Sequence, residues 1–280
     1  MRPRASFEAD FATAALPPAA PDETTAATMT DNSLSGKVAV ITGGSRGLGK
    51  AIARSLGGAG AQLALVSRTA TELDATAAEL RAAGITAQAF AADVTDEAAV
   101  AKVQQDVLAR FGKAHILVNN AGINIRKPVQ DFTLAEFRAV MDTTLISTFL
   151  MCRAFVPQMK PLGYGRIIGL SSTMGHVSIA HRTPYSAAKA GIMGFTRALA
   201  LELAPDGITV NTISPGPFAT EMNMTILNNP ELAQTFTSRI PLGRWGKVEE
   251  VGALAKFICS DGAAFMTGTD FLIDGGWCAQ

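Results

Sequence analysis

From residue 37 onward, short apolar runs alternate with longer segments whose apolar residues recur at helical spacing. Strands buried on both faces read as nearly continuous apolar runs, and the helices between them cover those faces. The predicted strands are residues 37–43, 62–68, 86–94, 114–122, 165–172, 208–216 and 269–276. The predicted helices are residues 49–60, 70–84, 96–112, 133–159, 186–207 and 248–260, the third starting near a possible cap at Thr95.

This alternation predicts the α/β class, with a single doubly wound Rossmann-type domain and a mostly parallel sheet of about seven strands. No internal repeat or linker divides residues 34–280, which are predicted to form this one domain. Residues 1–33 are rich in Ala, Pro and Thr without a hydrophobic period, so they are predicted to be a disordered N-terminal extension. Met29, near the end of this extension, could be the first residue of the native protein.

Composition narrows the function classes. Lys and Arg (24) balance Asp and Glu (24), so no net charge favours nucleic acid or an anionic membrane as partner. The sequence contains no run of 18 apolar residues, so no membrane span is predicted. The three cysteines and three histidines show neither disulfide nor metal-ligand spacing. We therefore expect a cytoplasmic protein in a reducing compartment, without a metal.

A glycine-rich loop, TGGSRGLGK, joins the first predicted strand to the first helix. Gly43, Gly47 and Gly49 have the spacing G-x3-G-x-G, which is neither the GxGxxG fingerprint nor a Walker loop. Glycines at such a turn let the backbone approach a pyrophosphate, which then sits at the helix N-terminus. An ordinary tight turn would explain a lone glycine cluster, but its place between strand and helix favours a dinucleotide site.

The end of the second predicted strand bears on the choice of cofactor. NAD sites usually carry an acid about 20 residues beyond the glycines, which binds the ribose 2'-hydroxyl. Here Ser67 and Arg68 stand at that place, and Arg46 lies in the glycine loop. Guanidinium groups pair with a 2'-phosphate through forked hydrogen bonds. We therefore predict NADP(H), the plain alternative for Arg68 being a solvated strand end.

Tyr185 and Lys189 stand four positions apart in PYSAAKAG and share a face of the predicted helix. The ammonium is expected to lower the pKa of the phenol, ordinarily near 10, toward working pH. The small residues between them leave room for a flat ring. Ser172 ends the preceding strand, where open α/β sheets place their ligands, and could hold a substrate oxygen.

Four motifs in order, TGGSRGLG, NNAG, SS and YSAAK, resemble those of the short-chain dehydrogenase/reductase family over residues 34–280. The Y-x3-K pair alone is frequent by chance, whereas the ordered set is specific. The resemblance implies hydride transfer between a nicotinamide and a carbonyl or secondary alcohol. It implies that Ser172 hydrogen-bonds the reacting oxygen, that Tyr185 is the acid or base, and that Lys189 lowers the tyrosine pKa and binds the nicotinamide ribose.

The resemblance also implies a set of cofactor contacts at the ends of the strands, besides Tyr185 and Lys189. The expected residues are Gly43, Ser45, Arg46, Gly47, Leu48, Gly49, Ser67, Arg68, Asp93, Val94, Asn119, Asn120, Ala121, Gly122, Pro215, Gly216, Phe218 and Thr220. Asp93 and Val94 would contact the adenine, and the residues from Pro215 onward would flank the nicotinamide carboxamide.

One position departs from the family pattern. Members usually have Asn in the helix after NNAG, where it helps hold a water of the proton relay, but this chain has Thr144. The main-chain carbonyl is retained, and the hydroxyl is expected to bond back to a carbonyl three or four residues earlier. We expect Thr144 to weaken the relay without abolishing it.

The stretches NAGINIRKP, PGPFATEMN and IPLGRWGKVEEV are similar to those of gluconate 5-dehydrogenases and related sugar-acid or polyol ketoreductases. Arg126 and Lys127 could meet a substrate carboxylate, although a solvated loop charge is the commoner role of such residues. Residues 222–236 predict a mobile helical flap over the site, with Met222 as an adaptable apolar contact. Met174 and His181 are further substrate candidates.

Three alternatives stay open. The 3-oxoacyl-carrier-protein reductases have much of the same sequence in these stretches. A non-catalytic dinucleotide sensor could lose Tyr185 or Lys189, yet both are present. A nucleotide-sugar epimerase would usually need a longer region after residue 216. Members of the family are commonly tetrameric through the last strand and two long helices, so the resemblance implies a homotetramer.

Overall fold

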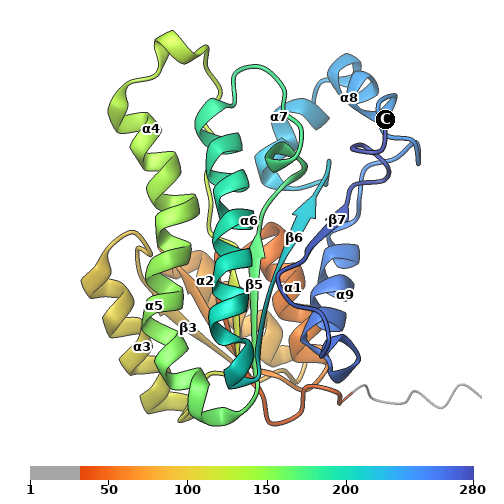
Figure 1. The fold of residues 1–280 in the computed structure, drawn as a ribbon. Coiled ribbons are helices and arrows are strands. Elements are labelled where there is room, and N and C mark those ends of the chain that lie inside the picture. The colour runs from red at the N-terminus through yellow and green to blue at the C-terminus, as the bar shows by residue number, and fades with distance from the viewer. Residues whose placement is uncertain (1–31) are drawn as a thin grey trace, which may run out of the picture. The chain divides into compact units, whose positions relative to one another are not determined.

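Seven parallel strands form the central sheet of residues 32–280, the part of the chain that the computed structural model describes (Figure 1). Their order is β3-β2-β1-β4-β5-β6-β7, so the chain winds outward from β1 first in one direction and then in the other. The strands are β1 (Val38–Thr42), β2 (Gln62–Ser67), β3 (Ala87–Ala91), β4 (Ile116–Asn119), β5 (Gly165–Leu170), β6 (Ile208–Pro215) and β7 (Asp270–Ile273). The predicted doubly wound α/β fold is confirmed.

Helices follow each strand except the last and cover both faces of the sheet (Figure 1). The helices are α1 (Gly47–Gly58), α2 (Ala70–Ala82), α3 (Glu97–Phe111), α4 (Leu134–Met141), α5 (Ser147–Met159), α6 (Thr183–Leu203), α7 (Met224–Leu227), α8 (Pro230–Thr237) and α9 (Val248–Cys259). One predicted helix, residues 133–159, is divided into α4 and α5 by a π-helical turn, Asp142–Ile146. The predicted segment 222–236 is helical, as α7 and α8.

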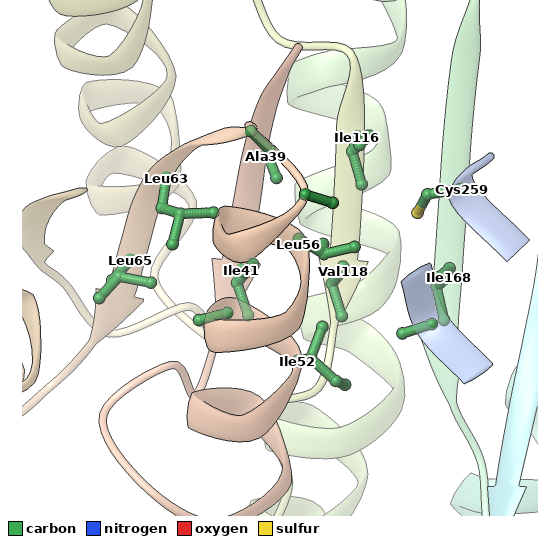
Figure 2. Packing of buried hydrophobic residues seen from close by; sticks show 14 of the residues in the cluster. Ala39, Ile41, Ile52, Leu56, Leu63, Leu65, Ile116, Val118, Ile168 and Cys259 are labelled. Carbon is green, nitrogen blue, oxygen red and sulfur yellow. The ribbon is translucent and has the colours of Figure 1, made fainter. Parts of the chain in front are cut away.

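The alternation of side chains along each strand separates two cores. On one face, Ala39, Ile41 and Leu63 pack against α1, α2 and α9 (Figure 2). On the other face, Val40 and Ala64 pack against α3, α5 and α6. Because both faces are buried, β1 has no exposed residue, which explains its continuous apolar run.

The cap of α3 differs from the sequence-based prediction, and most of the predicted N-terminal extension lies outside the described residues. Helix α3 is capped by Asp96, whose carboxylate accepts from the backbone N–H of Ala98 at 2.8 Å. Thr95 was wrong as the cap because its own N–H and hydroxyl bond the carboxylate of Asp93 at 2.9 and 2.8 Å. The predicted extension, residues 1–33, lies outside the described residues except for its last two positions, so its boundary stays a prediction.

The helical stretch Leu134–Leu162 is, among the described residues, long and apolar enough to cross a membrane by length and composition alone. Its most apolar window is 44% buried inside the fold. Phe155 and Met159 of this stretch are fully buried against the sheet. Its hydropathy is therefore largely accounted for by packing in the core.

Candidate active site

The strand order reverses between β1 and β4, and the segments that follow these two strands line a crevice at their carboxyl ends. Hydrogen bonds join the two segments. The hydroxyl of Thr42 accepts from the N–H groups of Asn120 and Ala121, each at 3.0 Å. The side-chain amide of Asn120 donates to the carbonyls of Thr42 at 2.9 Å and Gly43 at 3.1 Å. This polar seam fixes the floor of the crevice.

The glycine loop lies directly against this seam. Gly43 has φ +63, and a Cβ built there would stand 2.6 Å from the Asn120 amide nitrogen. A Cβ on Gly49 would stand 2.2 Å from the Gly43 carbonyl oxygen. Only glycine allows helix α1 to start so close to the end of β1. The N–H groups of the first turn of α1 can therefore face a ligand in the crevice.

The crevice is a cleft of about 600 Å³ at this edge of the sheet. Most of the residues predicted for the cofactor line it. Those that do are Gly43, Ser45, Arg46, Gly47, Leu48, Ser67, Arg68, Asp93, Val94, Asn120, Ala121, Gly122, Tyr185, Lys189, Pro215, Gly216, Phe218 and Thr220. Asn119 is buried beneath the floor, where its amide donates to Cys152 Sγ at 3.4 Å.

Arg46, Ser67 and Arg68 all line the wall of the cleft. Arg46 lies 3.7 Å from the carboxylate of Glu72 and Arg68 lies 4.0 Å from that of Asp93. Both arginine side chains are more than 60% exposed. Such ion pairs contribute little to stability, so both guanidinium groups remain able to bind a competing anion. The buried hydroxyl of Ser67 has no hydrogen-bond partner among the described residues.

Ser172, Tyr185 and Lys189 also line the cleft. Ser172 follows β5, where its hydroxyl accepts from the N–H of Met174 at 3.1 Å, and Tyr185 lies in the first turn of α6. Lys189 Nζ lies 5.5 Å from the centre of the Tyr185 ring and donates to the carbonyl oxygen of Leu170. All three side chains are at most 9% exposed. Local helix geometry and the end of β5 together produce this grouping.

The titration behaviour of this group differs from the sequence-based expectation. Burial raises the pKa of Tyr185, while the nearby Ser172 hydroxyl and the charges of Arg182 and Arg126 act to lower it. Burial also lowers the pKa of Lys189 to about 7. The expected lowering of the tyrosine pKa by Lys189 is therefore not found in the folded chain. The lysine is itself desolvated, and near neutral pH only part of the population carries its charge.

Thr144 lies in the π-helical turn and is fully buried. A Cβ on Gly122 would stand 3.4 Å from Thr144 Oγ1 and 3.7 Å from Lys189 Nζ, so both groups approach the same point. The expectation that the Thr144 hydroxyl bonds back along its helix was wrong, because Oγ1 has no partner among the described residues. Thr148 makes such a bond instead, to the Thr144 carbonyl at 3.1 Å.

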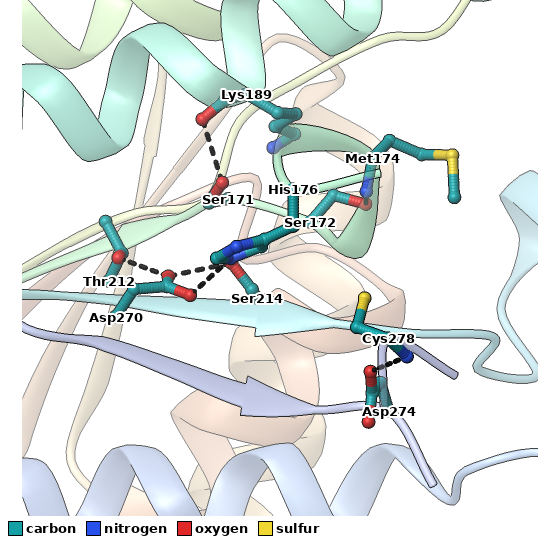
Figure 3. A network of polar contacts seen from close by, with 10 residues as sticks. All are labelled: Ser171, Ser172, Met174, His176, Lys189, Thr212, Ser214, Asp270, Asp274 and Cys278. Atoms are coloured by element: carbon teal, nitrogen blue, oxygen red, sulfur yellow. Dashed lines mark hydrogen bonds and ion pairs between the residues drawn. The ribbon is translucent and has the colours of Figure 1, made fainter. Parts of the chain in front are cut away.

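The turn that carries Ser172 is fastened to the last two strands by a polar network (Figure 3). His176, at the end of that turn, bonds Asp270 of β7 through Nε2 at 2.7 Å. The other oxygen of Asp270 accepts from Ser214 Oγ at 2.7 Å and from the hydroxyl of Thr212, both on β6. Asp270 thus links the turn after β5 to strands β6 and β7.

The predicted substrate residues are only partly brought together. Met222 lines the cleft, and Met174 packs in a small apolar cluster with Tyr185. His181 is exposed at φ +69, and its carbonyl accepts from Lys127 N at 3.2 Å. Arg126 is exposed and bonds Asn223, which lines the cleft, at 3.5 Å. Met174, His181 and Arg126 are not among the residues that line the cleft.

Sequence reasoning missed Asn124, which lines the cleft. Neither its amide nitrogen nor its amide oxygen has a partner among the described residues, and both atoms are buried. A polar residue in the stretch AGINI, directly after the cofactor motif, was the available signal. Such an amide is costly to leave unsatisfied and is well suited to a polar ligand.

The donor set fits a nicotinamide dinucleotide. The glycine loop forms a cradle that a Cβ would fill, the hydroxyl of Ser67 is unpartnered, and two guanidinium groups stand beside it. These features suit a pyrophosphate and a ribose carrying a 2'-phosphate. Within residues 32–280, no group of three or more His, Cys, Asp or Glu side chains is arranged to hold a metal ion.

Comparison with protein families and curated proteins gives consistent matches. Residues 43–278 match the profile of a family described as enoyl-(acyl carrier protein) reductase. Gluconate 5-dehydrogenase of Gluconobacter oxydans is 34% identical over 244 residues, which cover 87% of this chain and 95% of the relative. A 3-oxoacyl-[acyl-carrier-protein] reductase of Pseudomonas aeruginosa is 38% identical over 245 residues, which cover 87% of this chain and 98% of the relative. D-threitol dehydrogenase of Mycolicibacterium smegmatis is 36% identical over 247 residues, which cover 88% of this chain and 95% of the relative.

Solved structures give the same picture. A putative gluconate dehydrogenase from Agrobacterium tumefaciens superimposes with a TM-score of 0.86 at 37% identity, covering 88% of this chain and 98% of the other. A putative NAD(P)-dependent gluconate 5-dehydrogenase from Beutenbergia cavernae, with bound NADP at low occupancy, has a TM-score of 0.85 at 35% identity. That match covers 89% of this chain and all of the other.

Proposed function

The chain belongs to the short-chain dehydrogenase/reductase family, and we propose that within it the protein is an NADP(H)-dependent ketoreductase of sugar acids or polyols. It is an oxidoreductase that uses a nicotinamide cofactor and acts on CH–OH groups. The observation that carries the proposal is the meeting of Ser172, Tyr185 and Lys189 beside a glycine-lined cleft. The pair of guanidinium groups beside Ser67 supports NADP(H) over NAD(H).

The bound nicotinamide supplies or accepts the hydride. The glycine loop and the start of α1 would hold its pyrophosphate, and Arg46, Ser67 and Arg68 would hold the 2'-phosphate. The segment after β6, from Pro215, would close the nicotinamide end of the cleft.

Proton transfer falls to the buried group. In reduction, the Ser172 hydroxyl holds the carbonyl oxygen and the Tyr185 phenol donates its proton to that oxygen. Because burial raises the pKa of Tyr185, the phenol is protonated at neutral pH, as reduction requires. The ammonium form of Lys189 stabilises the phenolate that remains. Oxidation needs the phenolate as base, so it is favoured at higher pH.

Sugar acids and polyols are supported by the activities for which two relatives are named and by Arg126, which bonds the cleft residue Asn223. A second candidate is reduction of a 3-oxoacyl thioester. It is supported by a 38% identical relative of that activity and by the apolar cluster of Val140, Met174 and Tyr185, which could lie along an acyl chain. A non-catalytic sensor is disfavoured because it would not need the buried Tyr185 and Lys189.

A substrate panel tests the proposal. NADPH consumption would be measured with 5-keto-D-gluconate, L-sorbose and an acetoacetyl thioester under one set of conditions. We expect the highest kcat/KM with one of the two sugar-derived ketones. A preference for the thioester would select the second candidate, and no turnover of any carbonyl would favour the sensor.

We also propose a cytoplasmic homotetramer. The free thiols of Cys152, Cys259 and Cys278 are compatible with a reducing compartment. Exposed apolar side chains on the two long helices and the last strand, Phe149, Leu201 and Leu272, support association through those elements.

A further inference from the structure

Two positively charged side chains near Tyr185 form no ion pair with a carboxylate of residues 32–280. Arg126 follows β4, and Arg182 immediately precedes α6. The nearby Lys127 is already paired with Glu136, so that acid does not neutralise them.

The two loops that carry these arginines are joined. The N–H of Lys127 donates to the carbonyl of His181 at 3.2 Å, which holds the residues next to Arg126 and Arg182 together. Burial and the charge of Arg126 both lower the pKa of Arg182, and the charges of the two arginines act to lower the pKa of Tyr185. Like charges brought together without a counter-ion repel each other, and a bound anion would relieve that repulsion.

Asn124 lies on the same loop as Arg126 and lines the cleft. Its amide is buried and unpartnered at both polar atoms, as described above. Ile123 and Ile125 on either side pack against the apolar cluster that contains Tyr185. The apolar surroundings lower the local dielectric, which strengthens polar contacts to a ligand.

Glu221, which directly precedes the predicted flap, does not cancel this charge. Glu221 lines the cleft, but its carboxylate lies 3.2 Å from the position of a Cβ on Gly47, at the glycine loop. Asn223, two residues later, is the flap residue that Arg126 bonds. Glu221 thus faces the glycine loop, whereas Arg126 bonds Asn223.

We propose that Asn124, Arg126 and Arg182 form the substrate subsite, in which the two guanidinium groups bind the carboxylate of an open-chain sugar acid and the Asn124 amide binds one of its hydroxyl groups. This inference rests on the proposed ketoreductase function. It assigns specificity for the anion to a pair of arginines from two different loops. The carbonyl of the same substrate then reaches Ser172 and Tyr185.

Two ketones that differ only in the carboxylate test the subsite. 5-Keto-D-gluconate carries a carboxylate where L-sorbose carries a hydroxymethyl group. Rates with both would be measured for wild type, Arg126→Met and Arg182→Met, with Arg110→Met, exposed near the end of α3, as the matched control. NADPH binding and thermal unfolding would verify that each variant is folded.

The subsite predicts that Arg126→Met and Arg182→Met each lower kcat/KM for 5-keto-D-gluconate by roughly tenfold or more, while the value for L-sorbose changes less than about threefold. Any change of proton transfer at Tyr185 affects both ketones equally and cancels in the ratio. Asn124→Asp should also lower the ratio of kcat/KM for 5-keto-D-gluconate to kcat/KM for L-sorbose, because it places a like charge beside the substrate carboxylate. Equal losses for both ketones, or no loss, would overturn the proposal.

Calorimetric titration with D-gluconate and D-glucitol in the presence of NADP⁺ separates failure of the subsite from failure of the proposed function. Binding of D-gluconate that is lost in Arg182→Met supports the subsite even if neither ketone is turned over. Equal binding of the two compounds, or equal binding to wild type and variant, contradicts it even if turnover is found.

Discussion

At the residue scale, Lys189 shows how burial changes the chemistry that a motif suggests. The Y-x3-K spacing correctly places the lysine one turn from Tyr185, and its position beside the ring follows from helix geometry. Its depressed pKa follows from the enclosure by β5 and α6, which no local spacing reveals. Asn124 was missed for the same reason, since its orphaned amide is a property of the folded surroundings.

Lys189 gives a prediction on stability and pH. Its pKa is about 7 in the folded chain and is near 10.4 in an unfolded chain. Between pH 7 and 9 the unfolded chain therefore binds more protons, and the contribution of Lys189 to the free energy of unfolding rises with pH, by at most about 1.4 kcal/mol per unit. This contribution is lost as the pH falls through the folded pKa.

Urea unfolding at pH 7 and pH 9, at one protein concentration, would measure this effect. The stability difference between wild type and Lys189→Met should shift in favour of wild type at pH 9, because the variant cannot titrate at this position. A difference that is the same at both pH values would show that Lys189 keeps its proton when buried.

Arg68 carries the prediction on cofactor choice. Wild type should have at least about a tenfold higher kcat/KM with NADPH than with NADH, since charge-assisted contacts contribute roughly 1.5–3 kcal/mol each. Arg68→Asp should reverse the preference by repelling the 2'-phosphate, whereas Arg110→Asp, away from the cleft, should not. Equal efficiency with both cofactors in wild type would contradict the assignment.

At the element scale, the strands and most helices were predictable because buried parallel strands and amphipathic helices have distinct apolar periods. The π-helical turn at Asp142–Ile146 was not resolved from the pattern, because a single extra residue per turn barely alters the apolar spacing. The bond between His176 and Asp270 joins residues 94 positions apart. It depends on the pairing of β6 with β7, where Thr212 faces Asp270, and so could not be predicted from local sequence.

That bond predicts a positioning role for Asp270. Asp270→Asn keeps the shape of the side chain but cannot accept from His176, Ser214 and Thr212 together. The turn bearing Ser172 should loosen, and kcat should fall by roughly threefold to tenfold while the Kd for NADPH stays nearly unchanged. Steady-state kinetics and NADPH fluorescence would measure both, with Asp106→Asn on α3 as control. A loss of NADPH affinity that matches the loss of kcat would indicate general damage to the fold instead.

At the scale of the whole molecule, three exposed apolar side chains lie on the two long helices and the last strand. Phe149 on α5, Leu201 on α6 and Leu272 on β7 are 42%, 80% and 46% exposed. Exposed apolar patches of this kind commonly mark protein–protein contacts. They support the proposed homotetramer.

Sedimentation at micromolar concentration would test assembly. Wild type should have the mass of four chains, and Phe149→Glu should reduce it, because a charge would be buried in an apolar contact. Val129→Glu, which changes a side chain 67% exposed outside those elements, should leave the mass unchanged. A wild-type monomer would contradict the tetramer.

The central claim is that the buried Ser172, Tyr185 and Lys189 perform proton transfer in a carbonyl reductase. Its most direct test is the turnover number of Tyr185→Phe, measured by NADPH oxidation with the best ketone of the panel, alongside the Kd for NADPH from fluorescence titration. The substitution keeps the ring in its buried place and removes the proton donor. We predict an unchanged Kd for NADPH and a turnover number lowered by roughly 10²–10⁴; near-normal turnover would contradict the claim.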